Sequence, residues 1–245
     1  MRSASVLESP LARFMRSGMS FDRVAPLYRG LEWILAGTIL QNARTCHFDR
    51  LGNARHILVV GEGIGRSLEQ LVIQAPAAEI TVIEASAAMI EIAKRRLSRM
   101  HLSVSRITWH HADIRSWDME ARSFDTVITP FVMDCFLPAD VEAIVARIGG
   151  AVGPRGQWLY ADFQIPACGW RRTRARLIHA LMYRTFRTLV NLEAGKVAPA
   201  GPSLERAGFM LESRIERCGA LISSELWRRP QRVPFLSCNG RDMSS

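Results

Sequence analysis

Three glycines at two-residue spacing, Gly61, Gly63 and Gly65, directly follow an apolar run at residues 57–60. An unbroken run of mostly branched apolar residues is typical of a strand buried on both faces of a parallel sheet. A helical pattern begins near Ser67. Glycine permits positive φ and lets a ligand lie against bare backbone, and the start of a helix presents unpaired N–H groups. This stretch therefore predicts the first half of a nucleotide-binding βαβ unit.

The spacing of these glycines favours one kind of nucleotide over another. A dinucleotide site has the pattern G-x-G-x-x-G, with an acidic residue about 20 positions further on. In this chain the spacing is G-x-G-x-G, and Arg66 stands where the third dinucleotide glycine belongs. A bulky side chain at the close contact between helix and strand, in a turn with no nest sized for a pyrophosphate, disfavours NAD and FAD.

This glycine pattern resembles motif I of the class I S-adenosylmethionine-dependent methyltransferases. In that family the turn passes beneath the methionine part of the cofactor, so the resemblance implies S-adenosyl-L-methionine as cofactor and Gly61, Gly63 and Gly65 as contacts to it. The family usually has an acidic residue two positions before the first glycine, where this chain has Val59. Glu62, inside the loop, is the candidate to take over a contact with the ammonium group of the cofactor.

A carboxylate ends the second predicted strand. Residues 80–83 are apolar and lead into Glu84 and Ala85. A carboxylate at the C-terminal tip of this strand can accept hydrogen bonds from both ribose hydroxyls, because an anionic acceptor matches two neighbouring donors. Sites for NAD use the same device, so Glu84 alone does not separate the two cofactors. The resemblance places Glu84 and Ala85 at the cofactor.

A second carboxylate follows the third predicted strand. Residues 107–112 lead into Asp113 and Ile114. The resemblance implies that Asp113 accepts a hydrogen bond from the adenine amino group and that Ile114 lies beside the cofactor. The alternative is that Asp113 caps a short turn near Trp117. Three motifs at family-typical intervals, all at strand ends, indicate S-adenosyl-L-methionine more strongly than any one of them alone.

The fourth predicted strand, residues 123–129, leads to the position of the methyl acceptor. Ligands of open α/β sheets bind beyond the carboxyl ends of the strands. The resemblance therefore implies that Thr129 contacts the cofactor and that Phe131 lines the substrate pocket. The sequence after Thr129 is not the Asp/Asn-Pro-Pro-aromatic motif of DNA amino-methyltransferases, which disfavours methylation of nucleic-acid amines. Asp134 is a candidate base or substrate contact, and the alternative is that it caps a helix starting near Pro138.

The N-terminal segment has a pattern of its own. Residues 21–28 read Phe-Asp-Arg-Val-Ala-Pro-Leu-Tyr. They resemble the lead-in of the ubiquinone and menaquinone C-methyltransferases and their small-molecule relatives, in which such a segment packs over the open edge of the cofactor cleft. The resemblance makes Tyr28 a candidate lid, substrate-binding or catalytic residue, with ordinary core packing as the alternative. The acidic residue that follows this tyrosine in the family is Arg29 here.

Methyl transfer from an activated cofactor requires alignment more than acid–base chemistry. Positioning alone supplies effective molarities of about 10⁵–10⁸ M, so a dedicated base is optional. If the acceptor is a hydroxyl or an enol carbon, a nearby group takes its proton. The candidates are Asp134, Asp162 at the end of a predicted strand at residues 156–163, Tyr28 and His179. The sequence does not choose among them.

A long predicted helix at residues 170–191 is rich in arginine and carries an apolar stripe. It is a candidate for peripheral contact with an anionic membrane or for binding a diphosphate. The simpler interpretation is a solvated face over a core stripe. The last predicted elements are a short helix at 202–208 and two strands at 209–216 and 220–228, which the resemblance pairs as a hairpin.

Composition is consistent with one cytoplasmic globular domain. The 245 residues are 48% hydrophobic and carry a formal net charge of +9, with only two lysines. This positive charge leaves nucleic acid, anionic lipid or an acidic substrate open as partners. Five scattered cysteines without a C-x-x-C pair favour reduced thiols over disulfides, and no metal site is predicted. The first 20 residues have no apolar h-region, so no secretory signal is predicted.

The resemblance implies an α/β fold: a Rossmann-like, doubly wound sheet of seven strands with the last strand antiparallel. We expect an N-terminal helical lid at residues 1–50, a methyltransferase domain at 51–229 and a tail at 230–245. The expected function is methyl transfer from S-adenosyl-L-methionine to a small-molecule acceptor, with a lipophilic, quinone-like or isoprenoid-like acceptor as the finer prediction. The alternatives are an RNA or protein methyltransferase and a non-catalytic S-adenosylmethionine-binding subunit. The oligomeric state is not predicted.

Overall fold

The computed structural model describes residues 38–102, 104–119, 124–164 and 199–231. Several sequence predictions lie outside these residues and stay predictions: Tyr28 with its lead-in at 21–28, the arginine-rich stretch at 170–191 that includes His179, and nearly all of the tail. Within the described part, no helix is long and apolar enough to cross a bilayer.

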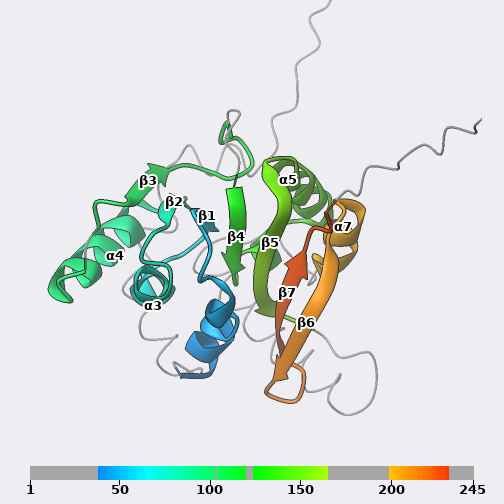
Figure 1. The fold of residues 1–245 in the computed structure, drawn as a ribbon, viewed down its shortest axis with the longest axis horizontal. Coiled ribbons are helices and arrows are strands. Elements are labelled where there is room, and N and C mark those ends of the chain that lie inside the picture. Colours follow the sequence, from blue (N-terminus) through cyan, green and yellow to red (C-terminus); the bar gives the residue numbers. More distant parts are fainter. Residues whose placement is uncertain (1–37, 103, 120–123, 165–198, 232–245) are drawn as a thin grey trace, which may run out of the picture.

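A seven-stranded sheet forms the centre of the protein (Figure 1). Its strands lie in the order β3-β2-β1-β4-β5-β7-β6. The pairs among β1 to β5 are parallel, and β7 runs antiparallel to both of its neighbours. The bounds are β1 His56–Val60, β2 Glu79–Glu84, β3 Ile107–His111, β4 Phe124–Pro130, β5 Val152–Phe163, β6 Met210–Arg217 and β7 Ile222–Arg228. The predicted fold class is confirmed, including the antiparallel last strand.

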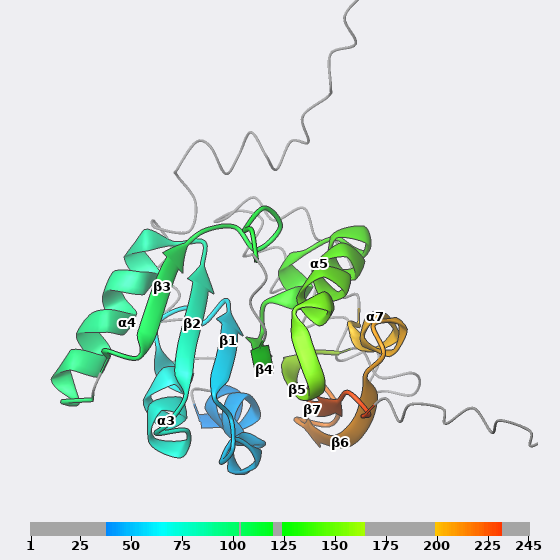
Figure 2. The same cartoon turned by 45° about the horizontal axis from the view of Figure 1, so that its top comes forward.

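Helices cover both faces of this sheet, which is why the central strands are apolar along their whole length. On one face, α3 (Arg66–Gln74) and α4 (Ala87–Arg99) pack with η1 (Phe48–Arg50) against Ile57 and Val59 of β1. On the other face, α5 (Pro138–Gly150) and α7 (Gly201–Arg206) pack against Leu58, Val60 and Trp158. Alternate residues of β1 thus enter opposite core layers, and Figure 2 shows the two helix pairs on opposite sides.

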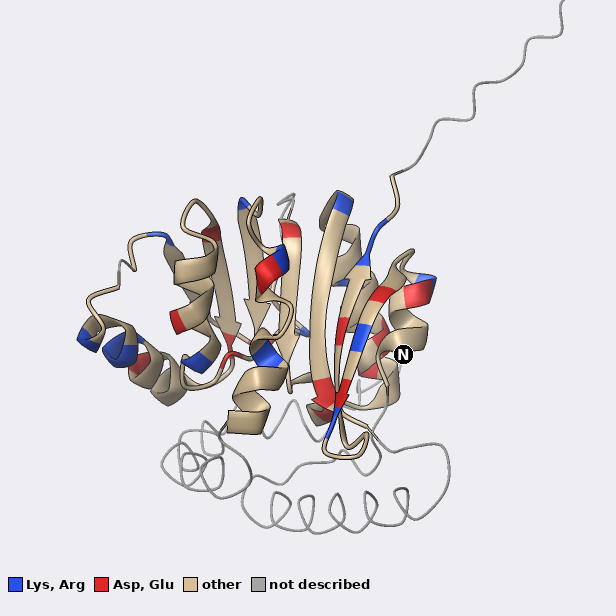
Figure 3. Cartoon of the chain, turned by 60° about the horizontal axis from the view of Figure 1, so that its bottom comes forward, with Lys and Arg blue, Asp and Glu red and all other residues tan. Residues whose placement is uncertain are grey.

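The strand order changes direction between β1 and β4. The chain moves outward from β1 through β2 to β3 and then returns to pair β4 with the other edge of β1. Such a switch point leaves a crevice beyond the carboxyl ends of the two strands, and ligands of open α/β sheets bind there. Two parallel strands finish with acidic residues at this edge, Glu84 as the last residue of β2 and Asp162 as the penultimate residue of β5. Figure 3 shows red strand ends along the same edge.

The start of the described chain lies at this edge too. Residues 38–45 are helical. The Gln41 side chain donates a hydrogen bond to the Arg66 carbonyl at the start of α3, and Arg44 lies over the Phe131 ring at 5.1 Å, just after β4. This helix therefore extends from the beginning of α3 to the end of β4. The described part of the expected lid segment is thus at the crevice.

Candidate active site

The loop between β1 and α3 is built from three glycines in the left-handed region. Gly61, Gly63 and Gly65 have φ of 70°, 67° and 80°. A Cβ on Gly61 would lie 2.5 Å from Val132 Cγ2, and a Cβ on Gly65 would lie 2.8 Å from the Ala93 Cβ in α4. These two glycines are needed for packing inside the protein, because no side chain fits at such distances.

Gly63 differs from the other two glycines. A Cβ there would meet, among the described residues, nothing nearer than Met89 Sδ at 3.8 Å. The conformation still favours glycine, but the space beside it is open. Bare backbone facing open space at the switch point of the sheet is what a ligand lying against the loop requires.

Glu84 lies under this loop and fixes its shape. One carboxylate oxygen accepts a hydrogen bond from the Gly63 N–H at 2.9 Å, and the other accepts from the Ser86 N–H at 3.0 Å. Burial raises the pKa of Glu84, against the effect of these backbone donors. Each carboxylate oxygen has a second acceptor site, so Glu84 can still meet hydroxyl groups of a ligand.

Glu62 has a structural role in the loop. Its carboxylate accepts hydrogen bonds from the Ser67 and Leu68 N–H groups, at 2.8 and 3.3 Å, and from the Ser67 hydroxyl. These are donors of the first turn of α3, which has no side-chain cap from Gly65 at its N-cap position. Burial raises the pKa of Glu62, while the nearby Arg44 opposes the rise. The predicted contact to a cofactor ammonium stays untested, and the structure shows helix capping.

Asp113 begins a turn after β3, as the alternative from sequence proposed. Its carbonyl accepts from the Trp117 N–H at 2.9 Å, and its carboxylate accepts from the Arg115 backbone and guanidinium. The contact to an adenine amino group stays a prediction. Ile114 is buried in the core, so its side chain packs inside the domain. Ala85 is half-buried, and its carbonyl lies 3.1 Å from His111 Nε2.

The Thr129 side chain lies in the core, and its predicted contact with the cofactor stays a prediction. It is fully buried, and its hydroxyl accepts a hydrogen bond from Trp158 Nε1 at 2.9 Å. The cause is the register of the sheet: Thr129 and Trp158 are on neighbouring strands and face the layer beneath α5. The hydroxyl is therefore used to satisfy a buried indole N–H.

Phe131 follows β4 at the carboxyl edge, as predicted. Its ring packs against Phe163 with ring centroids 5.1 Å apart, and the Arg44 guanidinium lies over the Phe131 ring at 5.1 Å from its centroid. Leu40, Ala43 and Ile222 complete this apolar cluster. Arg44, 7% exposed, is a residue that sequence reasoning missed. Its position depends on the packing of helix 38–45 against β4, for which the local pattern gives no signal.

Asp134 and Asp162 come together, although the sequence suggested them separately. The Asp134 N–H donates to an Asp162 carboxylate oxygen at 3.1 Å, which brings the two residues together. The alternative role of Asp134 as a helix cap is wrong, because α5 has Leu137 at its N-cap and no side-chain cap. Asp134 lies instead in η2 (Met133–Cys135), where the chain turns back toward β5.

These two carboxyl groups share a buried environment that favours the protonated form. Two neighbouring buried carboxyl groups resist carrying two negative charges, so the pair holds one proton over a wide pH range. Burial raises the pKa of Asp134 to about 6. Burial and the negative charge of Asp134 raise the pKa of Asp162 well above its ordinary value. The pair can therefore accept a proton at neutral pH once Asp162 or Asp134 is ionised.

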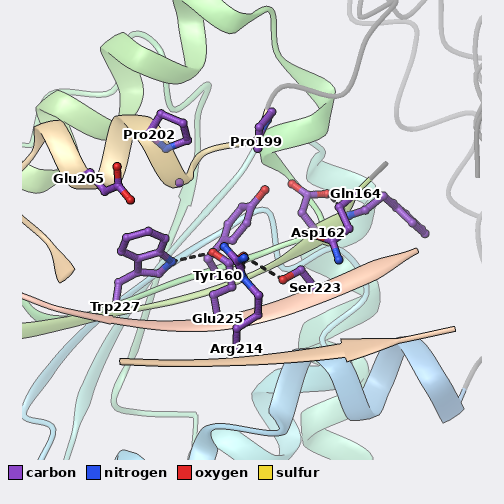
Figure 4. A pocket seen from close by; sticks show the side chains of 12 residues that line it. Tyr160, Asp162, Gln164, Pro199, Pro202, Glu205, Arg214, Ser223, Glu225 and Trp227 are labelled. Carbon is purple, nitrogen blue, oxygen red and sulfur yellow. Dashed lines mark hydrogen bonds and ion pairs between the residues drawn. The ribbon is translucent and has the colours of Figure 1, made fainter. Parts of the chain in front are cut away.

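A cavity of about 260 Å³ opens beside Asp162, between β5, β7, β6 and α7 (Figure 4). Sequence reasoning missed this cavity, because β7 enters from a hairpin far along the chain. One signal was available: Tyr160 and Asp162 are two apart on a strand and so point to the same face. The polar and aromatic side chains lining it include Tyr160, Asp162, Arg214, Ser223, Glu225 and Trp227.

Comparisons with known proteins agree with this geometry. Residues 57–156 match the family model described as "Methyltransferase domain". This part of the chain is similar to methyltransferase domains. The match begins in β1 and ends within β5, so it includes the glycine loop, Glu84 and Asp134. A search of curated proteins finds no match.

Solved structures of methyltransferases share the fold of this chain. An O-methyltransferase family protein from Burkholderia thailandensis superposes with a TM-score of 0.68 at 14% identity, covering 91% of this chain and 63% of that protein. The chain thus spans less than two thirds of that relative. A 1,6-didemethyltoxoflavin-N1-methyltransferase from Burkholderia thailandensis gives 0.59 at 17% identity, with 94% of each chain covered. The N-methyltransferase NodS from Bradyrhizobium japonicum gives 0.56 at 18%, covering 89% and 97%.

Proposed function

We propose that the protein is an S-adenosylmethionine-dependent methyltransferase that acts on a small-molecule acceptor. The observation that carries this proposal is the open backbone of Gly63 held by Glu84 at the switch point of the sheet. The methyltransferase domain match over the same residues supports it. Two of the solved structures, NodS and the 1,6-didemethyltoxoflavin-N1-methyltransferase, contain S-adenosylhomocysteine.

The residues present fit this cofactor. The space beside Gly63 is open because glycine has no Cβ. A ligand in that space would lie against the loop backbone. Glu84 would accept from neighbouring hydroxyl groups, because its carboxylate is already oriented by two backbone donors. When bound, the cofactor supplies a methyl group activated by a sulfonium sulfur. The protein then has to align the acceptor and exclude water.

The acceptor would lie beyond the ends of β4 and β5. Phe131 and Phe163 offer an apolar surface there, and Asp134 and Asp162 offer proton acceptors. The apolar surface supports an acceptor with a lipophilic portion. A quinone-like or isoprenoid-like acceptor rests on the resemblance of residues 21–28 alone, which lie outside the described residues. The proposal of a small molecule is supported by the toxoflavin precursor bound in one relative.

Calorimetry on the full chain tests the cofactor assignment. We expect S-adenosylmethionine and S-adenosylhomocysteine to bind and NAD not to bind. Gly63→Arg should abolish binding, because the side chain would fill the open space beside the loop. Glu212→Gln is the matched control, since Glu212 lies on the edge strand β6 in an ion pair with Arg228. Binding of NAD in place of S-adenosylhomocysteine, or retained affinity in Gly63→Arg, would contradict the proposal.

A non-catalytic binding subunit is the alternative that Val59 suggested from sequence. In the structure Val59 is fully buried in the layer beneath α3, so its side chain takes no part in the loop surface. Turnover separates the alternatives: tight binding of S-adenosylhomocysteine with no methyl transfer to any acceptor would favour the binding subunit. An affinity for RNA that falls steeply with salt would favour the RNA methyltransferase instead.

A further inference from the structure

The cavity beside Asp162 has an excess of acidic groups in a protein of net positive charge. Asp162, Glu205 and Glu225 line it together with a single described base, Arg214. Arg214 Nε donates to Glu225 Oε1 at 2.9 Å, so this pair neutralises itself. Glu225 also accepts from the Ser223 hydroxyl and from Trp227 Nε1, both at 2.8 Å. The carboxyl groups of Asp162 and Glu205 remain to set the charge of the cavity.

Asp162 has no cationic partner among the described residues. It is 1% exposed, and within the described ranges no lysine or arginine forms an ion pair with Asp162 or Asp134. Its carboxylate oxygens accept from the Phe163 and Asp134 N–H groups, at 2.8 and 3.1 Å. Burying two carboxyl groups without a counter-charge is costly, and the pair keeps a proton as a result. A bound ammonium group would replace that proton.

The cavity is next to the place proposed for methyl transfer. Val132 touches Gly61 closely enough to exclude a Cβ there. Asp134 comes two residues later and bonds to Asp162, which lines the cavity. A short chain of contacts thus leads from the cofactor loop to the cavity. Figure 4 shows Tyr160 and Asp162 on β5 and Ser223, Glu225 and Trp227 on β7 around the same space.

We propose that the methyl acceptor is an amine whose ammonium group binds at Asp162 in this cavity. The inference rests on the proposed methyltransferase function and names the class of its substrate. Tyr160 and Trp227 add aromatic surface to the lining, and aromatic faces attract ammonium groups. A volume of about 260 Å³ suits a small organic amine or the amine end of a larger molecule.

The carboxyl pair also supplies the chemistry that an amine needs. An ammonium nitrogen has no free electron pair, so it must first lose a proton, and the ionised Asp134–Asp162 pair accepts it. The lone electron pair on the amine nitrogen then forms the bond to the methyl carbon, while the carbon–sulfur bond breaks and its electrons stay on sulfur. The proton then passes from the carboxyl pair to solvent. Tyr160 lies two residues before Asp162 on β5 and lines the same cavity.

Three ligands of one shape test the charge preference: benzylamine, benzyl alcohol and benzoate. Calorimetry at pH 7.5 uses the full chain saturated with S-adenosylhomocysteine. We expect benzylamine to bind in the millimolar range or better, benzyl alcohol about tenfold more weakly, and benzoate not at all. Benzylamine binding should release a proton, measured as a dependence of the heat on the ionisation enthalpy of the buffer, because the ammonium displaces the shared proton.

Variants separate this inference from the proposed function. Asp162→Asn should lower benzylamine affinity about tenfold or more and abolish proton release. Tyr160→Phe, which keeps the ring, should lower affinity by a smaller factor, and Glu212→Gln on the edge strand should change nothing. Retained binding of S-adenosylhomocysteine shows that each variant is folded. If S-adenosylhomocysteine does not bind the wild-type chain, the proposed function fails. If it binds but benzylamine does not, or benzoate binds as well, or Asp162→Asn has no effect, the amine inference alone is overturned.

Discussion

Glu84 accepts a hydrogen bond from the Gly63 N–H at 2.9 Å and so joins the end of β2 to the loop that follows β1. The same carboxylate accepts from the Ser86 N–H, at the start of the turn into α4. One buried side chain thus connects the two loops that border the proposed cofactor site. Its removal affects both the shape of the loop and the hydrogen bonds offered to a ligand.

Glu84→Ala should weaken S-adenosylhomocysteine binding by roughly 1.5–3 kcal/mol, the range for hydrogen bonds to a charged group. Glu84→Gln should lose less, because one amide oxygen remains to accept a bond and the side-chain volume is kept. Calorimetry at neutral pH measures both. Equal affinity for wild type and Glu84→Ala would show that this carboxylate does not meet the ligand.

Asp134→Asn should change how stability depends on pH. Burial raises the folded-state pKa of Asp134 to about 6 from an ordinary value of 3.8. The unfolded chain therefore loses this proton first, and the group makes the folded state less stable as pH rises from about 4 through 6. The amide removes the titration, and it can donate to the Asp162 carboxylate. The variant should be more stable than wild type at pH 7.5, by on the order of 1–3 kcal/mol.

Melting temperatures at pH 4.5 and 7.5 check this expectation. The difference between variant and wild type should be small at pH 4.5 and in favour of the variant at pH 7.5. Glu62, Glu84 and Asp162 also have raised pKa values, so the comparison must be made with wild type at each pH. A variant that is less stable than wild type at pH 7.5 would contradict the shared-proton description.

The glycines of the loop should respond differently to substitution. Gly61→Ala places a Cβ in steric conflict with the Val132 side chain and puts alanine at a positive φ. Both effects should destabilise the fold. We expect a loss of about 2 kcal/mol or more in the free energy of unfolding, by analogy with overpacking in cores. Val132→Ala in the same chain should restore part of it. Gly63→Arg should lose less stability, about 1 kcal/mol for the φ alone, while ligand binding disappears.

Thermal unfolding and calorimetry together decide this contrast between the two glycines. If Gly61→Ala were as stable as wild type, the packing of Val132 on the loop would be wrong. If Gly63→Arg unfolded the protein as severely as Gly61→Ala, the open space beside Gly63 would be wrong.

Thr129→Val should lower stability without lowering affinity for the cofactor. The substitution keeps the shape of the side chain but leaves Trp158 Nε1 without its buried acceptor, at a cost of about 1–3 kcal/mol. Denaturant unfolding measures the loss, and calorimetry with S-adenosylhomocysteine measures the affinity. A large loss of affinity with unchanged stability would contradict this expectation and would support the side-chain contact with the cofactor that the sequence suggested.

The cofactor half of the site could be predicted because its signals are local. An apolar strand, a glycine turn and a helix start are contiguous, and strands next to each other in sequence bring Glu84 to the same edge. The roles of Glu62 and Thr129 could not be predicted. The Glu62 side chain caps the first turn of α3, which has no side-chain cap from its N-cap residue. The Thr129 hydroxyl contacts Trp158 because β4 pairs with β5.

The acceptor half depends on contacts between distant segments. Asp134 and Asp162 were each recognisable as carboxylates near strand ends, but their hydrogen bond spans 28 residues of sequence and follows from the turn η2. No sequence pattern indicates the positions of Arg44 and Glu225. The position of Arg44 depends on the packing of helix 38–45, and that of Glu225 depends on the insertion of β7 between β5 and β6.

The reversed direction of β7 has a consequence for how this domain can diversify. Because it runs against β5, its first residues, from Ile222 onward, arrive at the same edge as the last residues of β5. The hairpin from β6 thus delivers side chains to the acceptor cavity without passing through β1 or β2. Mutations in that hairpin can alter which molecule is methylated while the machinery for the methyl donor is inherited unchanged.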